Sequence, residues 1–379
     1  MMEKLGNFIS EYSVRNKQDE DIPVYSVTNE HGFCTGYFSK DVSSKDRTTY
    51  KIVPYGCFAY NPSRINVGSV DWQHVEDRVI VSPLYVVFRV NEELDQRYLL
   101  HYLKSDMTLA LIKAKASGSV RDNLKLSDLQ EFPIVVHNIE KQRRVADNID
   151  KVDQLISLYQ QRLVVLDELV KSRFIELFGD LMTNEKKWSQ QKISSVCIEV
   201  VDCINKTAPV VEEKTNYKMI RTTNVRNGSV NIVDVKYVTK ESFEKWTSRS
   251  VPQDRDVLLT REAPMGQVGI LFGAKNDIFL GQRLVSYRCD ETVMNPVFLL
   301  YQMMSSHFQN QIEKCGKGST VKHIPVPDCT EFRIFVPPID KQRTFEDFVT
   351  QVDKSKFVVQ QSLRELETLK KSLMQKYFG

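Results

Sequence analysis

The sequence predicts an α+β protein built as a pseudo-twofold repeat, with two long coiled-coil helices that run antiparallel. Three observations carry this prediction. The second half of the chain repeats the first about 200 residues later. Each half contains β-branched and aromatic runs bounded by Gly, Pro, Asn and Ser, which are typical of strands. Each half ends in a segment with 3-4 spacing of apolar residues, which is typical of coiled coils. Such symmetry suits a roughly twofold target, of which duplex DNA is the commonest.

The repeat is clearest in the segment that ends each half. Phe132–Gly179 aligns with Phe332–Gly379 without a gap. Identical stretches recur at equivalent places, among them Lys141-Gln142-Arg143 with Lys341-Gln342-Arg343 and Lys171-Ser172 with Lys371-Ser372. This alignment indicates that the chain contains two copies of one unit.

The remainder of each half is predicted to form strands around one helix. In the first half the expected strands are Ile22–Val27, Tyr50–Tyr60, Val79–Val90 and Glu131–Val136. In the second half they are Tyr217–Val225, Ser229–Val238, Asp256–Thr260, Val268–Phe272, Ile278–Cys289 and Glu331–Val336, with a tight hairpin turn at Asn227-Gly228. The expected helices are Asp95–Ala116 and Asn295–Cys315. The strands should be mostly antiparallel.

The two terminal segments are predicted to be coiled-coil helices. Their apolar stripes run through Ile149, Val152, Ile156, Tyr159, Leu163, Leu166, Val170 and Leu177, and through Val349, Val352, Val359, Leu363, Leu366, Leu373 and Tyr377. Arg173, Lys356 and Lys370 interrupt the stripes, so a partner helix or partner protein must accommodate them. Gly179 should end the first helix, and Pro337-Pro338 should limit the start of the second.

Chain geometry then favours pairing of the two helices. A helix from about Lys141 to Phe178 is roughly 57 Å long, and the second domain begins at its far end. If the stripes pair, the second helix runs back and the helices separate the domains. The expected ranges are 1–139 for the first α+β domain, 140–180 for the central helix, 181–339 for the linker and second domain, and 340–379 for the last helix. The alternative is that each stripe packs on its own domain.

Composition limits the class of protein. The 7 cysteines are scattered and never spaced C-x-x-C, which argues against a disulfide framework or a zinc site and favours a reducing compartment. No charged and apolar leader and no bilayer-length apolar run is present, so we expect a cytoplasmic protein without a membrane partner. A net charge of +3 does not by itself indicate nucleic-acid binding, so any DNA contact must come from local basic loops.

A first pair of loops holds candidate DNA-binding residues. Tyr60–Ser69 corresponds to Leu259–Gly269, and both are Pro/Gly-kinked loops with an arginine and a side-chain amide, groups that can bind guanine or adenine edges. The candidates are Arg64, Asn66, Ser69, Arg261 and Gln267. The alternative for each is a solvated surface side chain.

A second pair of segments has the small and basic residues of a phosphate-binding turn. Gly118–Lys125 corresponds to Gly318–His323. A further segment, Gly281-Gln282-Arg283, leads into a strand in the second half only. The candidates are Arg121, Asn123, Lys125, Gln282, Arg283, Lys317, Lys322 and His323. The alternative is an ordinary turn between helix and strand. Different side chains on one scaffold would allow the two domains to bind different sequences.

Catalytic motifs are absent from the sequence. Gly316–Thr320 lacks the upstream glycine of a phosphate loop, and Lys317 is not followed by Ser or Thr. Asn61-Pro62-Ser63-Arg64 lacks the aromatic residue of an adenine-methyltransferase signature. The 6 histidines form no H-E-x-x-H motif, and no cofactor loop is visible. The chain is therefore expected to be non-catalytic and to bind no metal or cofactor.

The order of these motifs resembles the specificity subunit (HsdS) of type I restriction-modification systems across essentially the whole chain. The resemblance rests on Pro337–Arg343 before a long helix, Phe174–Asp180 after one, and Lys187-Trp188 beyond it. It also rests on the segments Thr260–Gly266, Gly281–Leu284 and Gly318–Thr320. The first copy departs from the pattern by having His137-Asn138-Ile139 where Pro337-Pro338-Ile339 stands in the second.

The resemblance implies two target-recognition domains that each bind one half of a split, asymmetric sequence in double-stranded DNA. The helices would set the gap between the halves and dock two methyltransferase subunits, which use S-adenosylmethionine to methylate adenines. Motor-nuclease (restriction) subunits would join for cleavage, in a bacterial or archaeal cytoplasm. Two alternatives stay open: the recognition part of a single-chain restriction or methylation enzyme, and a coiled-coil scaffold without a DNA role.

Overall fold

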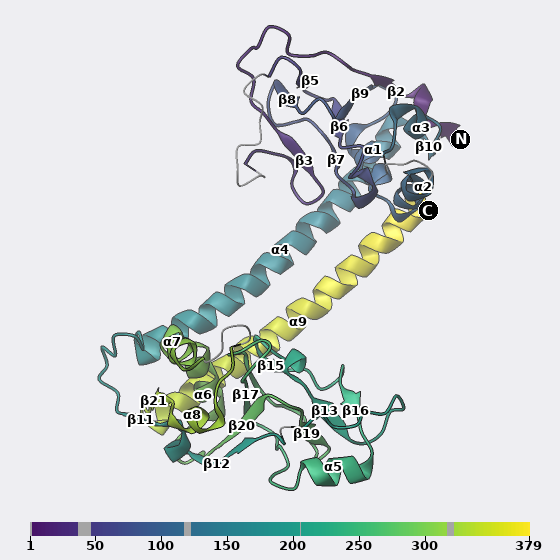
Figure 1. The fold of residues 1–379 in the computed structure, drawn as a ribbon. Coiled ribbons are helices and arrows are strands. Elements are labelled where there is room, and N and C mark those ends of the chain that lie inside the picture. Colours follow the sequence, from purple (N-terminus) through teal and green to yellow (C-terminus); the bar gives the residue numbers. More distant parts are fainter. Residues whose placement is uncertain (1, 37–46, 117–122, 205, 317–321) are drawn as a thin grey trace. The chain divides into compact units, whose positions relative to one another are not determined.

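The computed structural model describes residues 2–36, 47–116, 123–204, 206–316 and 322–379 (Figure 1). The chain divides into an N-terminal unit, Met1–Arg162 with Val359–Gly379, and a C-terminal unit, Leu163–Val358. Both units combine sheets with helices, and in both the long helix follows three shorter helices and a strand, so the predicted α+β repeat is confirmed. Two long helices, α4 (Ile139–Phe178) and α9 (Ile339–Phe378), contribute to both units.

The N-terminal unit is built on a four-stranded antiparallel sheet. Its order is β2 (Ile9–Glu11), β9 (Val86–Val90), β6 (Phe58–Tyr60) and β7 (Val70–Trp72). Three antiparallel pairs flank it: β1 (Met2–Lys4) with β10 (Pro133–Val135), β3 (Ser26–Thr28) with β4 (Gly32–Cys34), and β5 (Lys51–Pro54) with β8 (Arg78–Val81). The shorter helices are α1 (Gln96–Leu103), α2 (Asp106–Ala116) and α3 (Leu126–Gln130).

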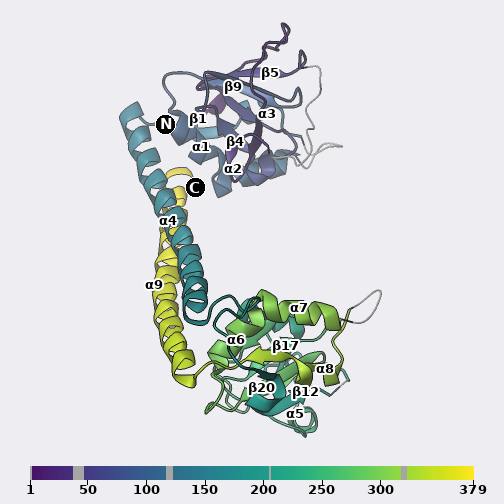
Figure 2. The same cartoon turned by 90° about the vertical axis from the view of Figure 1, so that its left-hand side faces the viewer.

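The C-terminal unit has a larger main sheet. Its six strands are ordered β12 (Cys197–Asp202), β20 (Leu284–Cys289), β17 (Val257–Thr260), β18 (Val268–Ile270), β15 (Gly228–Val230) and β14 (Val225–Arg226). Three of these strands, β12, β17 and β20, are labelled in Figure 2. Smaller sheets join β16 (Lys236–Tyr237), β13 (Lys218–Ile220) and β19 (Ile278–Leu280), and β11 (Gln190–Lys192) with β21 (Arg333–Phe335). The helices are α5 (Lys240–Trp246), α6 (Pro296–Met304), α7 (Ser306–Cys315) and α8 (Val326–Glu331). Only β13–β19 and β15–β18 pair in parallel within the described residues.

Each helix expected in the middle of a repeat is two helices in the structure. The break falls at a serine, Ser105 in one unit and Ser305 in the other. The Ser105 Oγ accepts from the Thr108 N–H (3.3 Å), and the Ser305 Oγ donates to the Gln302 carbonyl (2.6 Å). A serine that bonds the backbone in this way favours a helix boundary over continuation.

The predicted strand Tyr50–Tyr60 is likewise divided, into β5 and β6. The break lies at Tyr55–Cys57, where Gly56 adopts a positive φ of 82°. The hairpin turn predicted at Asn227-Gly228 is confirmed between β14 and β15, with positive φ angles of 50° and 82°.

The two long helices pair antiparallel in each unit. In the N-terminal unit Lys370 lies 2.6 Å from Asp153, and in the C-terminal unit Lys356 lies 2.5 Å from Asp167. Both lysines had been expected to interrupt the apolar stripe, and an acid on the opposite helix accommodates each. Although both helices have 40 residues, no helix in the described parts of the chain is long and apolar enough to cross a membrane.

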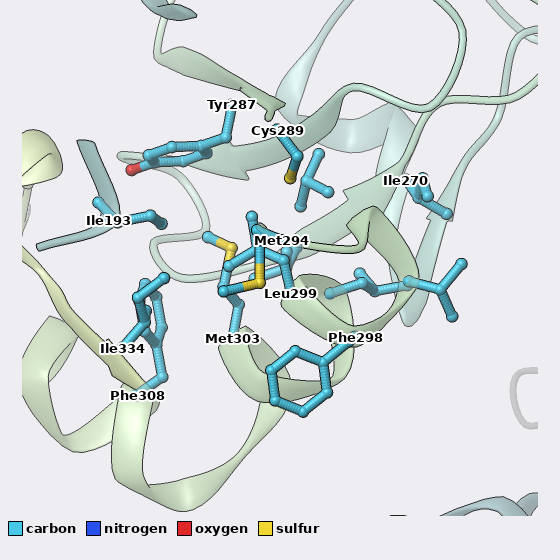
Figure 3. Packing of buried hydrophobic residues seen from close by; sticks show 14 of the residues in the cluster. Ile193, Ile270, Tyr287, Cys289, Met294, Phe298, Leu299, Met303, Phe308 and Ile334 are labelled. Carbon is cyan, nitrogen blue, oxygen red and sulfur yellow. The ribbon is translucent and has the colours of Figure 1, made fainter. Parts of the chain in front are cut away.

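In each unit, the end of the long helix that belongs to the other repeat packs into a hydrophobic core. Phe378 of α9 packs on Tyr98 of α1 in the N-terminal unit, with ring centroids 5.0 Å apart. Phe178 of α4 packs on Phe298 of α6 in the C-terminal unit, at 4.5 Å. Figure 3 shows that second core from close by. The structure therefore rules out the alternative in which each helix packs only on its own domain.

A buried glutamine at the start of each long helix fixes the helix to its own domain. Gln142 Oε1 accepts from the Asp95 N–H (2.9 Å), and its Nε2 donates to the Glu93 and His137 carbonyls (2.8 and 2.7 Å). Gln342 repeats all three bonds with residues 295, 293 and 337 at 2.8, 3.0 and 2.7 Å. Both side chains are fully buried. This accounts physically for the glutamine in the repeated Lys-Gln-Arg sequence.

We expect Gln342→Ala to destabilise the C-terminal unit by about 2–3 kcal/mol, because one N–H and two carbonyls lose their partner in a buried site. The thermal midpoint should fall by roughly 5–10 °C. Gln351→Ala, at an exposed position of the same helix, is the matched control and should leave the midpoint unchanged. Equal midpoints for the two variants would contradict this role for Gln342.

Candidate nucleic-acid interface

The loop between β6 and β7 presents two of the predicted DNA-binding side chains. A short 3-10 turn at Ile65–Val67 is anchored by the buried Ile65, and the N–H groups of residues 67 and 69 both donate to the Arg64 carbonyl at 3.2 Å. Arg64 and Asn66 are exposed, whereas Ser69 is only 4% exposed. The loop therefore offers a guanidinium and an amide to solvent, and Ser69 contributes to its packing.

This loop lines a surface hollow of about 410 Å³. Thr28, Asn29 and Glu30, from the β3–β4 hairpin, line the hollow together with residues of the Ser63–Ser69 loop. Hydrogen-bond donors and acceptors from two loops thus face one concave surface. Sequence reasoning missed the hairpin because no local pattern indicates that it lies beside residues 63–69.

Two ionisable groups, the buried Asp71 and the half-buried Lys104, contact the hairpin that lines the hollow. Asp71 on β7 accepts from the N–H groups of Phe33 (3.2 Å) and Trp72 (2.8 Å). Burial raises the pKa of Asp71, against the effect of these bonds and of Lys104. Burial lowers the pKa of Lys104, although Asp71 opposes the shift, and its ammonium donates to the Asn29 carbonyl (3.4 Å). These groups hold the hairpin against the sheet.

The second predicted segment of the first repeat lies beside the same loop. The Leu124 N–H donates to the Pro62 carbonyl (3.1 Å), and the Tyr60 hydroxyl donates to the Leu124 carbonyl (3.2 Å). Asn123 and Lys125 flank this buried residue and are exposed. Arg121 lies outside the described residues. The structure thus brings together two segments whose proximity the sequence did not indicate.

The β17–β18 loop of the C-terminal unit is held by a buried threonine. The Thr260 Oγ accepts from the Gln267 N–H (2.9 Å) and donates to the Pro264 carbonyl (2.5 Å). Gln309 on α7 donates from Nε2 to the Gly266 carbonyl at 3.2 Å. Gln267 itself is half-buried. This loop is fixed on both sides by the surrounding fold.

Arg261 is engaged within the protein. Its Nε donates to the Ile324 carbonyl (2.9 Å), and the Ile324 N–H donates back to the Arg261 carbonyl (3.0 Å). The second bond is the counterpart of the bond from Leu124 to Pro62. Lys322 and His323 precede Ile324 and are exposed, whereas Lys317 lies outside the described residues. The two predicted segments therefore meet in this unit as well.

Two further candidates lie close to Arg261. Arg283 is exposed, forms an ion pair with Glu262 (3.1 Å) and accepts at its carbonyl from the Arg261 N–H (2.7 Å). The half-buried Gln282 amide lies 3.1 Å from the Thr207 hydroxyl. Arg261, Gln282 and Arg283 therefore already have partners in the protein, and their contacts with DNA stay predictions.

The two long helices expose apolar residues beside the seam at which they pair. Leu155, Leu158, Val165 and Leu169 on α4 each precede a seam residue by one position, as do Val358 and Leu369 on α9. Their exposed fractions range from 41% for Leu155 to 61% for Val358. The first two and Leu369 belong to the N-terminal unit, and the rest to the C-terminal unit. We call these six residues the flank stripe; uncovered apolar surface of this kind is typical of a protein-binding site.

The chain matches a family model over most of its length. The model describes the type I restriction modification DNA specificity domain, and it matches twice, at residues 2–168 and 185–368. The two matches correspond to the two repeats found in the sequence.

Curated relatives and solved structures agree with this match. The type I restriction enzyme MjaVIII specificity subunit of Methanocaldococcus jannaschii is 20% identical over 310 residues, covering 78% of this chain and 72% of the relative. The putative MjaX specificity subunit of the same organism is 21% identical over 364 residues, covering 89% and 80%.

Two solved structures share the fold. One is a chain from a type I restriction-modification system, with a TM-score of 0.58 and 18% identity, covering 100% of this chain and 97% of that one. The other is the S subunit of a type I system from M. genitalium, with a TM-score of 0.56 and 13% identity, covering 100% and 96%. These two structures show the fold, whereas the doubled family match and the curated relatives show that the chain belongs to the type I restriction-modification specificity family and is a non-catalytic subunit of such a system.

Proposed function

We propose that each unit binds one half of a bipartite, asymmetric DNA sequence. The observation that carries this proposal is the meeting of the same two polar segments in both units, through the bonds from Leu124 to Pro62 and from Ile324 to Arg261. The scaffold is shared, but the exposed side chains differ. Two similar surfaces with different donors and acceptors suit two different half-sites.

The exposed side chains of these segments fit the two kinds of contact that DNA binding needs. Arg64 and Asn66 offer the groups that form paired hydrogen bonds with guanine and adenine in the major groove. Lys125 and Lys322 offer single charges that suit phosphates and carry no sequence information. Because the net charge of the chain is only +3, the phosphate contribution must come from such local groups.

The long helices would set the gap between the half-sites and dock two methyltransferase subunits. The flank stripe supports this role, because in each unit its leucines and valines are apolar and exposed on the long helices. S-adenosylmethionine would bind to the methyltransferase subunits, which would methylate adenines, and motor-nuclease subunits would join the complex for cleavage. Such a complex would work in the cytoplasm, where the chromosome is.

Co-expression of this chain with its cognate methyltransferase subunit should methylate adenines within one bipartite motif of fixed gap. Sequencing that detects methylated bases across a host genome measures this directly. Neither subunit alone should produce the modification. The proposal fails if methylation occurs without this chain, or if the motif is a single uninterrupted sequence.

Placing a charge on the flank stripe should weaken binding of the methyltransferase subunit. Leu158→Glu leaves a carboxylate to be desolvated in the complex, and we expect a loss of about 10- to 100-fold in affinity. Isothermal titration calorimetry with the purified methyltransferase measures the change. Gln161→Glu adds the same charge at an exposed position away from the seam and should bind normally. Equal affinity for both variants would show that the partner docks elsewhere.

A further inference from the structure

The two units carry equivalent hairpins beside their proposed DNA-binding loops. In the N-terminal unit, β3–β4 packs on β7, where the Phe33 N–H donates to Asp71. In the C-terminal unit, β14–β15 packs on β18, with Gly228 and Ser229 opposite Gly269 and Ile270 in a parallel pair. β7 and β18 are the strands that leave the two loops. Each hairpin tip therefore lies next to a loop already proposed to bind DNA.

Close contacts with the sheet fix each hairpin in place. A Cβ added to Gly32 would lie 1.9 Å from Asp71 Oδ2, and one added to Gly269 would lie 2.5 Å from the Ser229 carbonyl oxygen. Such distances leave no space for any side chain.

The helix before each break supports the same hairpin. Lys104, which follows α1, donates to the Asn29 carbonyl at 3.4 Å. Met304, which ends α6, would have its Sδ 3.2 Å from a Cβ on Gly228. Residues 104 and 304 are equivalent in the repeat, so both tips are held on the scaffold at the same point.

The two tips carry opposite charges. The Glu30 side chain is 85% exposed at the hollow that Arg64 and Asn66 also line, and His31 Nε2 lies 3.9 Å from its carboxylate. Arg226 is exposed at the tip of the other hairpin, where it pairs with Ser229 across the turn. An acid on a DNA-binding surface opposes phosphate binding, but it can accept a hydrogen bond from a base amino group.

We propose that the hairpin tips are specificity-determining elements, in which Glu30 accepts from the exocyclic amino group of a cytosine or adenine and Arg226 donates to a guanine. This inference rests on the proposed function, in which each unit binds one half of a DNA site. It adds a second base-contacting segment, the hairpin tip, to the loop already proposed in each unit. It also assigns a different class of base to each tip. A carboxylate accepts from an amino group, and a guanidinium matches the two acceptors of guanine.

The test uses the complete methyltransferase complex and the methylated motif of a host genome. Glu30→Gln and Glu30→Ala should reduce discrimination by about 10-fold or more at one base position within one half-site. Arg226→Ala should do the same at one position of the other half-site. The base that the unsubstituted complex requires at the relaxed position, cytosine or adenine, identifies the amino group that Glu30 binds.

Glu140→Gln, at an exposed position near the start of α4, is the matched control and should leave the motif unchanged. Thermal unfolding should be the same for all these variants, since the replaced side chains are exposed. An unchanged motif, a uniform fall in methylation at all sites, or relaxation of both half-sites by one variant would each overturn the inference. Failure of the proposed function is distinguishable, because the unsubstituted chain would then give no bipartite motif.

Discussion

The docking of each long helix into the domain of the other repeat is the contact on which the rest of the structure depends. Phe378 ends the second repeat but packs on Tyr98 of the first, and Phe178 ends the first repeat but packs on Phe298 of the second. Both phenylalanines are at most 5% exposed. Burial of a phenylalanine stabilises by roughly 1.5–3 kcal/mol, so each core gains a substantial part of its stability from a residue of the other repeat. Neither domain is complete until both helices are in place.

Ion pairs between the helices act on register more than on stability. The side chains of Lys370 and Asp153 are 38% and 37% exposed, and a pair so accessible to solvent stabilises by at most about 1 kcal/mol. A shifted register would instead leave each lysine in an apolar seam without an acid, which is costly. The position equivalent to Lys370 in the first repeat holds Val170 rather than a lysine. Near Lys356, burial raises the pKa of Asp353 although the lysine opposes the shift. The two repeats therefore place different charges in the helix pair.

Local and repeated patterns made much of the fold predictable. The 3-4 spacing and the gapless repeat indicated both long helices, and Asn227-Gly228 indicated its hairpin. The position of that hairpin beside the β17–β18 loop was not predictable, because it depends on pairing between residues about 40 positions apart. The candidate site was likewise predictable only in part. Arg64 stands exposed in a recognisable loop, whereas the bond from Arg261 to Ile324 joins distant residues and has no periodic signature.

Amide hydrogen exchange of the Phe378→Ala variant tests most directly whether the end of each long helix completes the core of the other repeat's domain. We expect the amides of α1, which lies more than 250 positions earlier in the chain, to lose protection, while those of α6 keep theirs. The expected destabilisation of the N-terminal unit is about 3–5 kcal/mol, as for other buried phenylalanines. Unchanged protection of α1, or a loss confined to α6, would contradict the account.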